Sequence, residues 1–253
     1  MPTYALMYHG FGQEHPIPRL NVDPAVFKEQ LQTLRKESFT SADPEQLSPP
    51  APKDQRVLVT IDDGLAGSYE ASLSALQQGF QPLIFLIGDK VNLPGFLTEE
   101  QISALATEGV SFGSHTNNLH DYQTSACKRL TEEVIAADLE QSITQIEQLT
   151  GKQPRIFAYP FGQVYSTLKK QVRQKFEYAF GTKPFQKASL AQVIFQPQGI
   201  LTPSVEAAED RFELPRIYLR RETTTDELVR SLQIPGYATY LKVRTIIGDQ
   251  LWG

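Results

Sequence analysis

The sequence predicts an α/β protein built on a parallel sheet, and two observations carry this prediction. Segments typical of buried strands alternate with segments typical of amphipathic helices along most of the chain. The strand segments are short apolar runs, such as 56–61 (RVLVTI) and 82–87 (PLIFLI), which are typical of parallel strands covered on both faces. The length of 253 residues suits one α/β barrel, so we expect a single domain over 1–253. Periodicity alone leaves a barrel and an open doubly wound sheet as alternatives.

Local signals place the individual elements. Asp23 and Pro24 predict a helix start, because Asp caps helices and Pro is tolerated in the first turn. Thr98 and Gln101 have the spacing of a capping box. The expected strands are 4–8, 56–61, 82–87, 110–113, 155–158, 178–181 and 214–219, and the expected helices are 24–36, 68–78, 98–109, 131–150, 166–175 and 225–232.

Composition excludes several classes of protein. The net charge of −5 argues against a surface for nucleic acid or anionic membrane. No apolar run approaches the roughly 18 residues of a membrane span. The single cysteine, Cys127, excludes an internal disulfide and a multi-cysteine metal site. The first residues lack the pattern of a signal peptide, so we expect a cytoplasmic location; the alternative is export, if Met1 replaces a removed signal peptide.

Polar residues of interest follow the predicted strands directly. In a parallel α/β protein, the carboxyl ends of the strands open onto one face, where ligand chemistry is built. Four separate segments deliver functional groups to this face, so the sequence predicts one site there. These groups are His9, Asp62 with Asp63, His115, and Pro160 with Phe161.

Two carboxylates and two histidines suggest metal chemistry. Adjacent residues at a strand end point to opposite sides, so one of Asp62 and Asp63 can bind a metal while the other acts as a base. His115 and His120 are five residues apart, which suits a curling loop. Two imidazoles and one carboxylate leave coordination positions open, as in catalytic sites. The alternatives are an Asp-Asp-Gly turn and histidines with structural roles. His15 lies in a polar loop, and we assign it no role.

Taken together, these residues resemble the polysaccharide deacetylase family, the NodB-like enzymes of carbohydrate esterase family 4. Residues 60–64 (TIDDG) are similar to the T-F-D-D-G motif of that family. Residues 113–120 resemble its second motif, which completes the metal site, and 158–162 resemble its third. The resemblance extends over residues 4–217 and implies a single-domain, distorted (β/α) barrel.

The departures from the common family pattern point to one branch. The two histidines are usually four residues apart, the third motif usually begins with Arg where this chain has Ala158, and the usual C-terminal motifs are missing. These departures are similar to the poly-N-acetylglucosamine deacetylases, which are circularly permuted. In that branch an N-terminal Tyr-His pair supplies the late histidine, and Tyr8-His9 matches it.

The resemblance implies a separate role for each candidate residue. Asp63, His115 and His120 would bind a divalent metal, with zinc as the default. Asp62 would be the general base, and His9 the general acid.

Three further expectations concern the surroundings of this centre. The backbone N–H of Phe161 would hold the oxyanion. Arg216, in the otherwise apolar segment 214–217, would replace the missing Arg that orients Asp62; a surface Arg is the alternative. Residues expected at the substrate, with core packing as the alternative for the tyrosines, are Tyr8, Tyr159, Tyr122 and Pro160.

The resemblance therefore implies hydrolysis of an N-acetyl amide on an N-acetylhexosamine-containing saccharide, which releases acetate and a free amine. One alternative is a metal-dependent amidase that acts on a small, lipid-linked or nucleotide sugar. The other is a carbohydrate-binding module without catalytic activity. No feature of the sequence indicates the oligomeric state.

Overall fold

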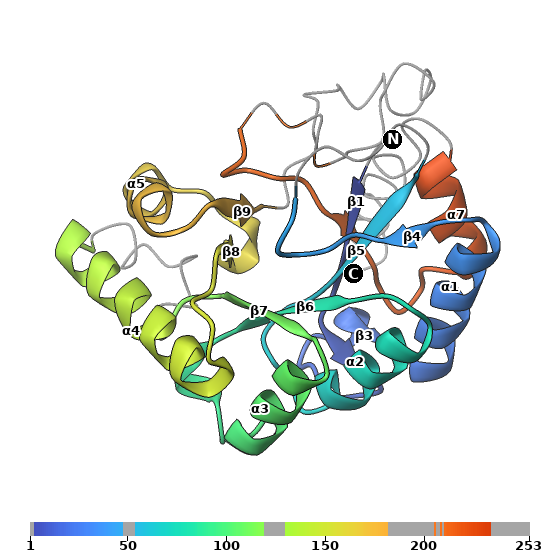
Figure 1. Cartoon of the computed structure of the whole chain (residues 1–253), viewed down its shortest axis with the longest axis horizontal. Helices are drawn as coiled ribbons and strands as arrows, with labels where there is room; N and C mark the ends of the chain where they lie inside the picture. The colour runs from blue at the N-terminus through green and yellow to red at the C-terminus, as the bar shows by residue number, and fades with distance from the viewer. Residues whose placement is uncertain are drawn as a thin grey trace.

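A parallel sheet of eight strands forms the centre of the molecule (Figure 1). The computed structural model describes residues 3–47, 54–118, 130–181, 205, 208 and 210–233. The strand order is β10-β1-β5-β6-β7-β8-β9, with β4 beside β5. The strands are β1 Thr3–Tyr8, β4 Thr40–Ser41, β5 Arg56–Ile61, β6 Pro82–Leu86, β7 Ser111–Ser114, β8 Ile156–Ala158, β9 Tyr178–Phe180 and β10 Ile217–Tyr218.

The sheet curls, and one segment contacts both of its edges. The N–H of Leu214 donates to the carbonyl of Ala179 in β9 (2.8 Å). Three residues later, Ile217 of β10 pairs with Leu6 of β1. The expected α/β fold with a distorted, barrel-like sheet is confirmed.

Helices cover the outside of the curved sheet (Figure 1). Two of the predicted helix starts have the expected caps: the Asp23 side chain accepts from Ala25 N–H, and Thr98 forms a capping box with Gln101. None of the helices in the described part of the chain is long and apolar enough to cross a membrane. The α-helices are α1 Pro24–Lys36, α2 Ser68–Gln77, α3 Glu99–Thr107, α4 Glu132–Thr150, α5 Ser166–Lys175 and α7 Thr225–Gln233.

The strands are buried on both faces, which explains their uninterrupted apolar sequences. Alternate side chains of one strand point to opposite faces. In β5, Val57 and Val59 pack in the cluster that includes α1 residues, whereas Leu58 packs in a separate cluster with Phe85 and Phe180. All five side chains are inaccessible to solvent.

Two short strands and a single helical turn shape the chain after β1. The strands β2 Gly10–Phe11 and β3 Asn21–Val22 pair in parallel, with η1 Pro18–Leu20 before β3. The sequence does not predict them, because two-residue strands have no periodic pattern to detect. They enclose the loop at 12–20, which borders the site described below.

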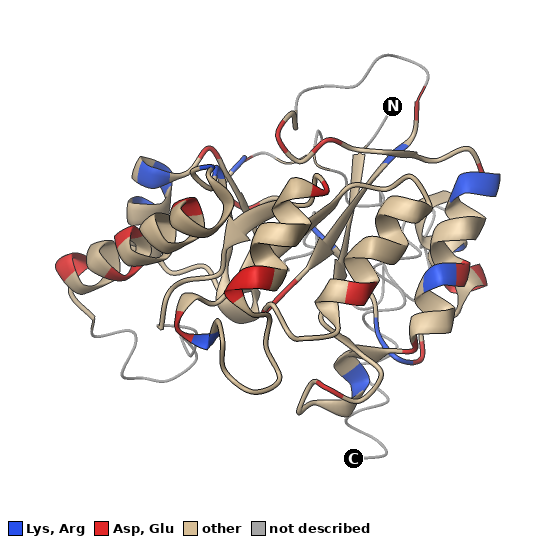
Figure 2. Ribbon diagram, turned by 60° about the horizontal axis from the view of Figure 1, so that its bottom comes forward, with Lys and Arg blue, Asp and Glu red and all other residues tan. Residues whose placement is uncertain are grey.

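Acidic and basic side chains are interspersed on the helices. Figure 2 shows no continuous basic stripe on the face that it presents, within the described residues. This distribution agrees with the net charge of −5.

Gly113 allows β7 to lie close to its neighbours. A Cβ atom there would lie 2.6 Å from the ring of Phe85 and 2.8 Å from the carbonyl oxygen of Ile156. We expect Gly113→Ala to lower the free energy of unfolding by about 1–3 kcal/mol, because the added methyl overpacks the strand interface. Urea denaturation measures this, with Ser111→Ala as a control that adds no atoms. An unchanged midpoint for Gly113→Ala would contradict the packing.

Candidate active site

A cleft of about 670 Å³ opens at the carboxyl ends of the strands. The loops that follow β1, β5, β7 and β8 contribute to its lining, as do residues in and on either side of β10. The structure therefore brings most of the predicted site residues to one place. Those that line the cleft are His9, Asp62, Asp63, His115, Pro160, Phe161 and Arg216.

Asp62 and Arg216 form a bidentate ion pair inside this cleft. Arg216 Nη1 lies 2.5 Å from Asp62 Oδ1, and Arg216 Nη2 lies 2.8 Å from Asp62 Oδ2. Both side chains are almost completely buried, at 3% and 1% exposure. Nη1 also donates to the hydroxyl of Thr60 (3.3 Å). Such paired contacts fix the plane of a carboxylate. Arg216 therefore occupies the position expected of an Arg that orients Asp62.

This pair determines the protonation of Asp62. Burial by itself raises the pKa of the carboxyl group, because desolvation disfavours the charge. The positive charge of Arg216, with smaller contributions from His115, from His9 and from the hydrogen bonds of Arg216, outweighs burial and holds the pKa of Asp62 below its ordinary value. Asp62 is consequently ionised at neutral pH, as a general base must be.

Removal of Arg216 should destabilise the fold. Arg216→Met leaves a buried carboxylate unpaired, which costs about 3–5 kcal/mol in comparable cases. Because the paired Asp62 has a lowered pKa, the pair stabilises the fold above the ordinary carboxyl pKa and loses this effect as the pH falls through the lowered value. Chemical denaturation should therefore show the largest difference between wild type and variant near neutral pH, and a smaller one in acid.

The matched control is the double variant Asp62→Asn with Arg216→Met, which removes both charges. It should be more stable than Arg216→Met alone at neutral pH, because no buried charge is left unpaired. Equal stability of wild type and Arg216→Met at neutral pH would show that the ion pair has no structural role.

Asp63 and His115 face one another as a potential pair of metal ligands. His115 Nδ1 lies 2.8 Å from the carbonyl oxygen of Ala158, which can only accept. In the neutral ring the proton therefore lies on Nδ1, and Nε2 has a lone pair. Nε2 lies 3.6 Å from Asp63 Oδ1. Two electron-pair donors that face each other in a cleft fit a divalent cation, and a carbonyl partner on the second nitrogen is typical of metal-binding histidines.

The carboxylate of Asp63 is ionised over the whole physiological range. Burial raises its pKa, but a hydrogen bond from His15 and the charges of His9 and His115 together lower that pKa to about 2. Its backbone has φ 73°, in the left-handed region that non-glycine residues rarely adopt. Strain of this kind persists where the surrounding structure fixes a functional group.

The third predicted ligand, His120, lies outside the described residues. Among the residues that the structure does describe, no group of three or more His, Cys, Asp or Glu side chains is arranged to hold a metal ion. The start of the loop toward His120 is fixed, because the buried Asp138 of α4 accepts from Asn117 N–H (3.0 Å) and Asn118 N–H (2.8 Å). The sequence does not single out Asp138, because it looks like any polar residue of an amphipathic helix.

His9 lies near the carboxylate of Asp62 in the same cleft. Its Nε2 atom lies 3.9 Å from Asp62 Oδ2. Its Nδ1 atom is buried and has no hydrogen-bond partner in the part of the chain that is described. Burial lowers the pKa of His9, and the nearby carboxylates of Asp62 and Asp63 only partly oppose this effect. A protonated His9 would therefore release its proton readily.

Phe161 and Pro160 form the rim that follows β8. They belong to the single helical turn η4 Pro160–Gly162, in which Phe161 has φ 55°. The side chain of Phe161 is 52% exposed, the largest value among the exposed large apolar side chains of the described residues. The N–H groups of Gly162 and Gln163 are used within the turn, by the carbonyls of Tyr159 and Pro160. The expected role of the Phe161 N–H remains a prediction.

Two predicted substrate contacts are corrected by the structure. Tyr8 is completely buried, and its hydroxyl donates to Gln30 (2.9 Å). Tyr159 is also completely buried and packs edge-to-face on Phe157. Neither ring has a surface on which a sugar could stack, so both are core residues. Tyr122 lies outside the described residues.

His15, to which the sequence assigns no role, also lines the cleft. Its Nε2 atom lies 3.4 Å from Asp63 Oδ2, and its ring centroid lies 5.6 Å from that of His9. No local pattern indicates this position, because the approach depends on how the loop at 12–20 folds over the end of β5.

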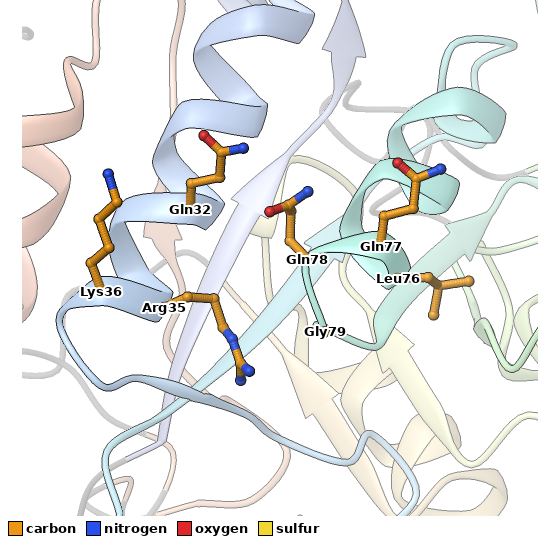
Figure 3. Close-up of a pocket in the computed structure, with 7 residues that line it drawn as sticks. All are labelled: Gln32, Arg35, Lys36, Leu76, Gln77, Gln78 and Gly79. Carbon is orange, nitrogen blue, oxygen red and sulfur yellow. The ribbon is translucent and has the colours of Figure 1, made fainter.

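A second cavity, of about 610 Å³, lies at the opposite end of the sheet. It is formed by the C-terminal ends of α1 and α2, where Figure 3 shows amide and basic side chains. Its lining contains no histidine or carboxylate, so we do not assign hydrolytic chemistry to it. The residues are Gln32, Arg35, Lys36, Leu76, Gln77, Gln78 and Gly79.

Comparison with known proteins agrees with this geometry. The family described as polysaccharide deacetylase matches residues 50–181, just over half of the chain. This chain belongs to the polysaccharide deacetylase family. A Bacillus subtilis (strain 168) protein named "Putative polysaccharide deacetylase YxkH" is 26% identical over 186 residues. The alignment covers 71% of this chain and 64% of that relative, so less than two thirds of the relative is represented.

Solved structures of deacetylases share the fold. The Streptococcus pyogenes deacetylase PplD in complex with acetate has a TM-score of 0.75 at 19% identity, over 92% of this chain and 98% of that one. IcaB from Ammonifex degensii has a TM-score of 0.68 at 22% identity, over 94% of this chain and 96% of that one. At these identities the likeness establishes the architecture, while the chemistry depends on the residues described above.

Proposed function

We propose that this chain is a metal-dependent hydrolase that removes N-acetyl groups from a saccharide containing N-acetylhexosamine, as in poly-N-acetylglucosamine. The observation that carries the proposal is the buried carboxylate of Asp62, fixed by Arg216, in the same cleft as His9 and the facing pair Asp63 and His115. Membership of the deacetylase family supports the same reaction class.

The residues present fit a divalent metal, with zinc as our expectation. Asp63 and His115 would hold it, and His120 is the expected third ligand. When bound, such an ion polarises the amide carbonyl and lowers the pKa of a water molecule toward roughly 7.

The residues of the chain supply the proton transfers. Asp62 accepts a proton from the water that attacks the acetyl carbon. The Phe161 N–H is expected to donate to the oxyanion that forms. The C–N bond then breaks, and His9 donates a proton to the departing nitrogen, because an amine leaves poorly without one. The products are acetate and a free amino sugar.

A second candidate substrate is an N-acetyl sugar that also bears a phosphate, such as a nucleotide or lipid-linked sugar. The observation that favours it is a set of cationic side chains in the same cleft. These are Arg19, Lys90, Arg216 and Arg220. Cations at this position would attract an anionic part of a substrate.

Acetate release from a set of substrates distinguishes these candidates. The set contains β-1,4- and β-1,6-linked N-acetylglucosamine oligomers and a nucleotide-linked N-acetylglucosamine. We expect release from an oligomer; preferential release from the nucleotide sugar would move the assignment to the second candidate. No release from any of them would leave a carbohydrate-binding module as the better description.

A further inference from the structure

We infer that His15 is a positioning residue for Asp63, whose Nε2–H holds one carboxylate oxygen so that the other faces His115. The two rings approach different oxygens: His15 Nε2 lies 3.4 Å from Oδ2, and His115 Nε2 lies 3.6 Å from Oδ1. The inference rests on the proposed function, in which Asp63 is a metal ligand.

Hydrogen bonds assign opposite tautomers to the two rings. The backbone N–H of Ile17 donates to Nδ1 of His15 (3.0 Å), so this nitrogen has the lone pair and Nε2 has the proton. His115 is the reverse, because its Nδ1 donates to a carbonyl oxygen. His15 therefore presents a donor to Asp63, whereas His115 presents a lone pair. Only a lone pair can bind a metal, so His15 suits the role of an orienting partner.

The loop that carries His15 is fixed on both sides of its backbone. The side chain of Asn21 accepts from the N–H of His15 (2.7 Å) and donates to its carbonyl (2.9 Å). Asn21 is 4% exposed. Gly10 makes this approach possible, since a Cβ atom there would lie 2.8 Å from the Cβ atom of His15 and 2.4 Å from Asn21 Oδ1.

A further contact ties the loop to the element that follows Asp63. The carboxylate of Glu14 accepts from the backbone N–H of Gly67 (2.9 Å), which is the N-cap residue of α2. The positions of His15 and Asp63 are thus fixed relative to each other by contacts other than their own. This arrangement is what a residue that orients a metal ligand requires.

Two substitutions distinguish the contact of His15 Nε2 with Asp63 from the hydrogen bond that His15 Nδ1 accepts from Ile17. In His15→Asn, the amide oxygen can take the place of Nδ1 and accept from Ile17, but the side chain is too short to reach Asp63. In His15→Gln, the longer amide places an N–H near the position of Nε2. Loss of such an orienting partner typically weakens metal binding by roughly 10–100-fold. We expect that loss for His15→Asn, and an affinity within a few-fold of wild type for His15→Gln.

The measurement is zinc affinity in competition with a chromophoric chelator, on variants whose thermal unfolding shows that they are folded. Asp226→Asn on the surface of α7 is the control, because this side chain is 69% exposed and does not line the cleft; it should keep the wild-type affinity. If His15→Asn does not fold, His15→Leu replaces it as the variant without a donor.

The outcomes separate this inference from the proposed function. Equal zinc affinity of wild type and His15→Asn (or of His15→Leu, where it replaces that variant) would overturn the role of His15 and leave the proposed function in place. A wild-type chain without zinc affinity would overturn both. Weakened binding by His15→Asn with recovery in His15→Gln would support the inference.

Discussion

Replacement of Asp62 by Asn is expected to abolish turnover while the metal content stays near one ion per chain. Asn has nearly the same shape as Asp but cannot accept a proton, and loss of a general base typically costs about 10²–10⁴-fold in rate. The metal should stay, because the structure places Asp62 on Arg216 and assigns the carboxylate of Asp63 to the facing pair with His115. Acetate release and metal analysis on the same sample test both statements.

The control for this variant is Asp226→Asn on the surface of α7. Asp226 is 69% exposed and pairs with Arg230 one turn along the helix, so neither activity nor metal content should change. If Asp62→Asn lost its metal together with its activity, Asp62 would have to be reassigned as a ligand.

Replacement of His9 by Ala should reduce turnover of an amide substrate by roughly two to four decades, the scale of general acid catalysis. His9 Nε2 lies 3.9 Å from Asp62 Oδ2, so an acid here stands beside the base in the same cleft. An amine needs a proton to leave, whereas a nitrophenolate does not. The loss should therefore be much smaller for a 4-nitrophenyl ester than for an N-acetyl sugar.

This comparison of leaving groups separates a chemical role from a structural one. A misfolded or distorted cleft would lose both activities equally. Amide turnover near the wild-type rate in His9→Ala would return His9 to a packing role.

The fold was largely predictable because its main strands are buried on both faces. Continuous apolar runs mark β5 and β6, and the helix limits follow from capping side chains such as Asp23. The short pair β2 and β3 was not predictable, because its paired residues are eleven positions apart and no local pattern marks them.

The site was predictable where it follows from topology. His9, Asp62 and His115 end parallel strands, and such ends meet on one face. The contact of Arg216 with Asp62 was predicted from an Arg in an apolar segment and from the missing Arg of the third motif. Two aspects needed coordinates: the burial of Tyr8, which depends on how α1 packs over the strand end, and the approach of His15.

One paired measurement tests whether an acetamide is hydrolysed at the cleft that contains Asp62 and Asp63. Acetate and free amine are counted in the same reaction with an N-acetylglucosamine oligomer, before chelation, after chelation and after zinc is restored. We predict equal amounts of the two products, loss of both on chelation and their return with zinc. Acetate formation that chelation leaves unchanged would contradict the proposed metal dependence, and absence of both products throughout would contradict the proposed reaction.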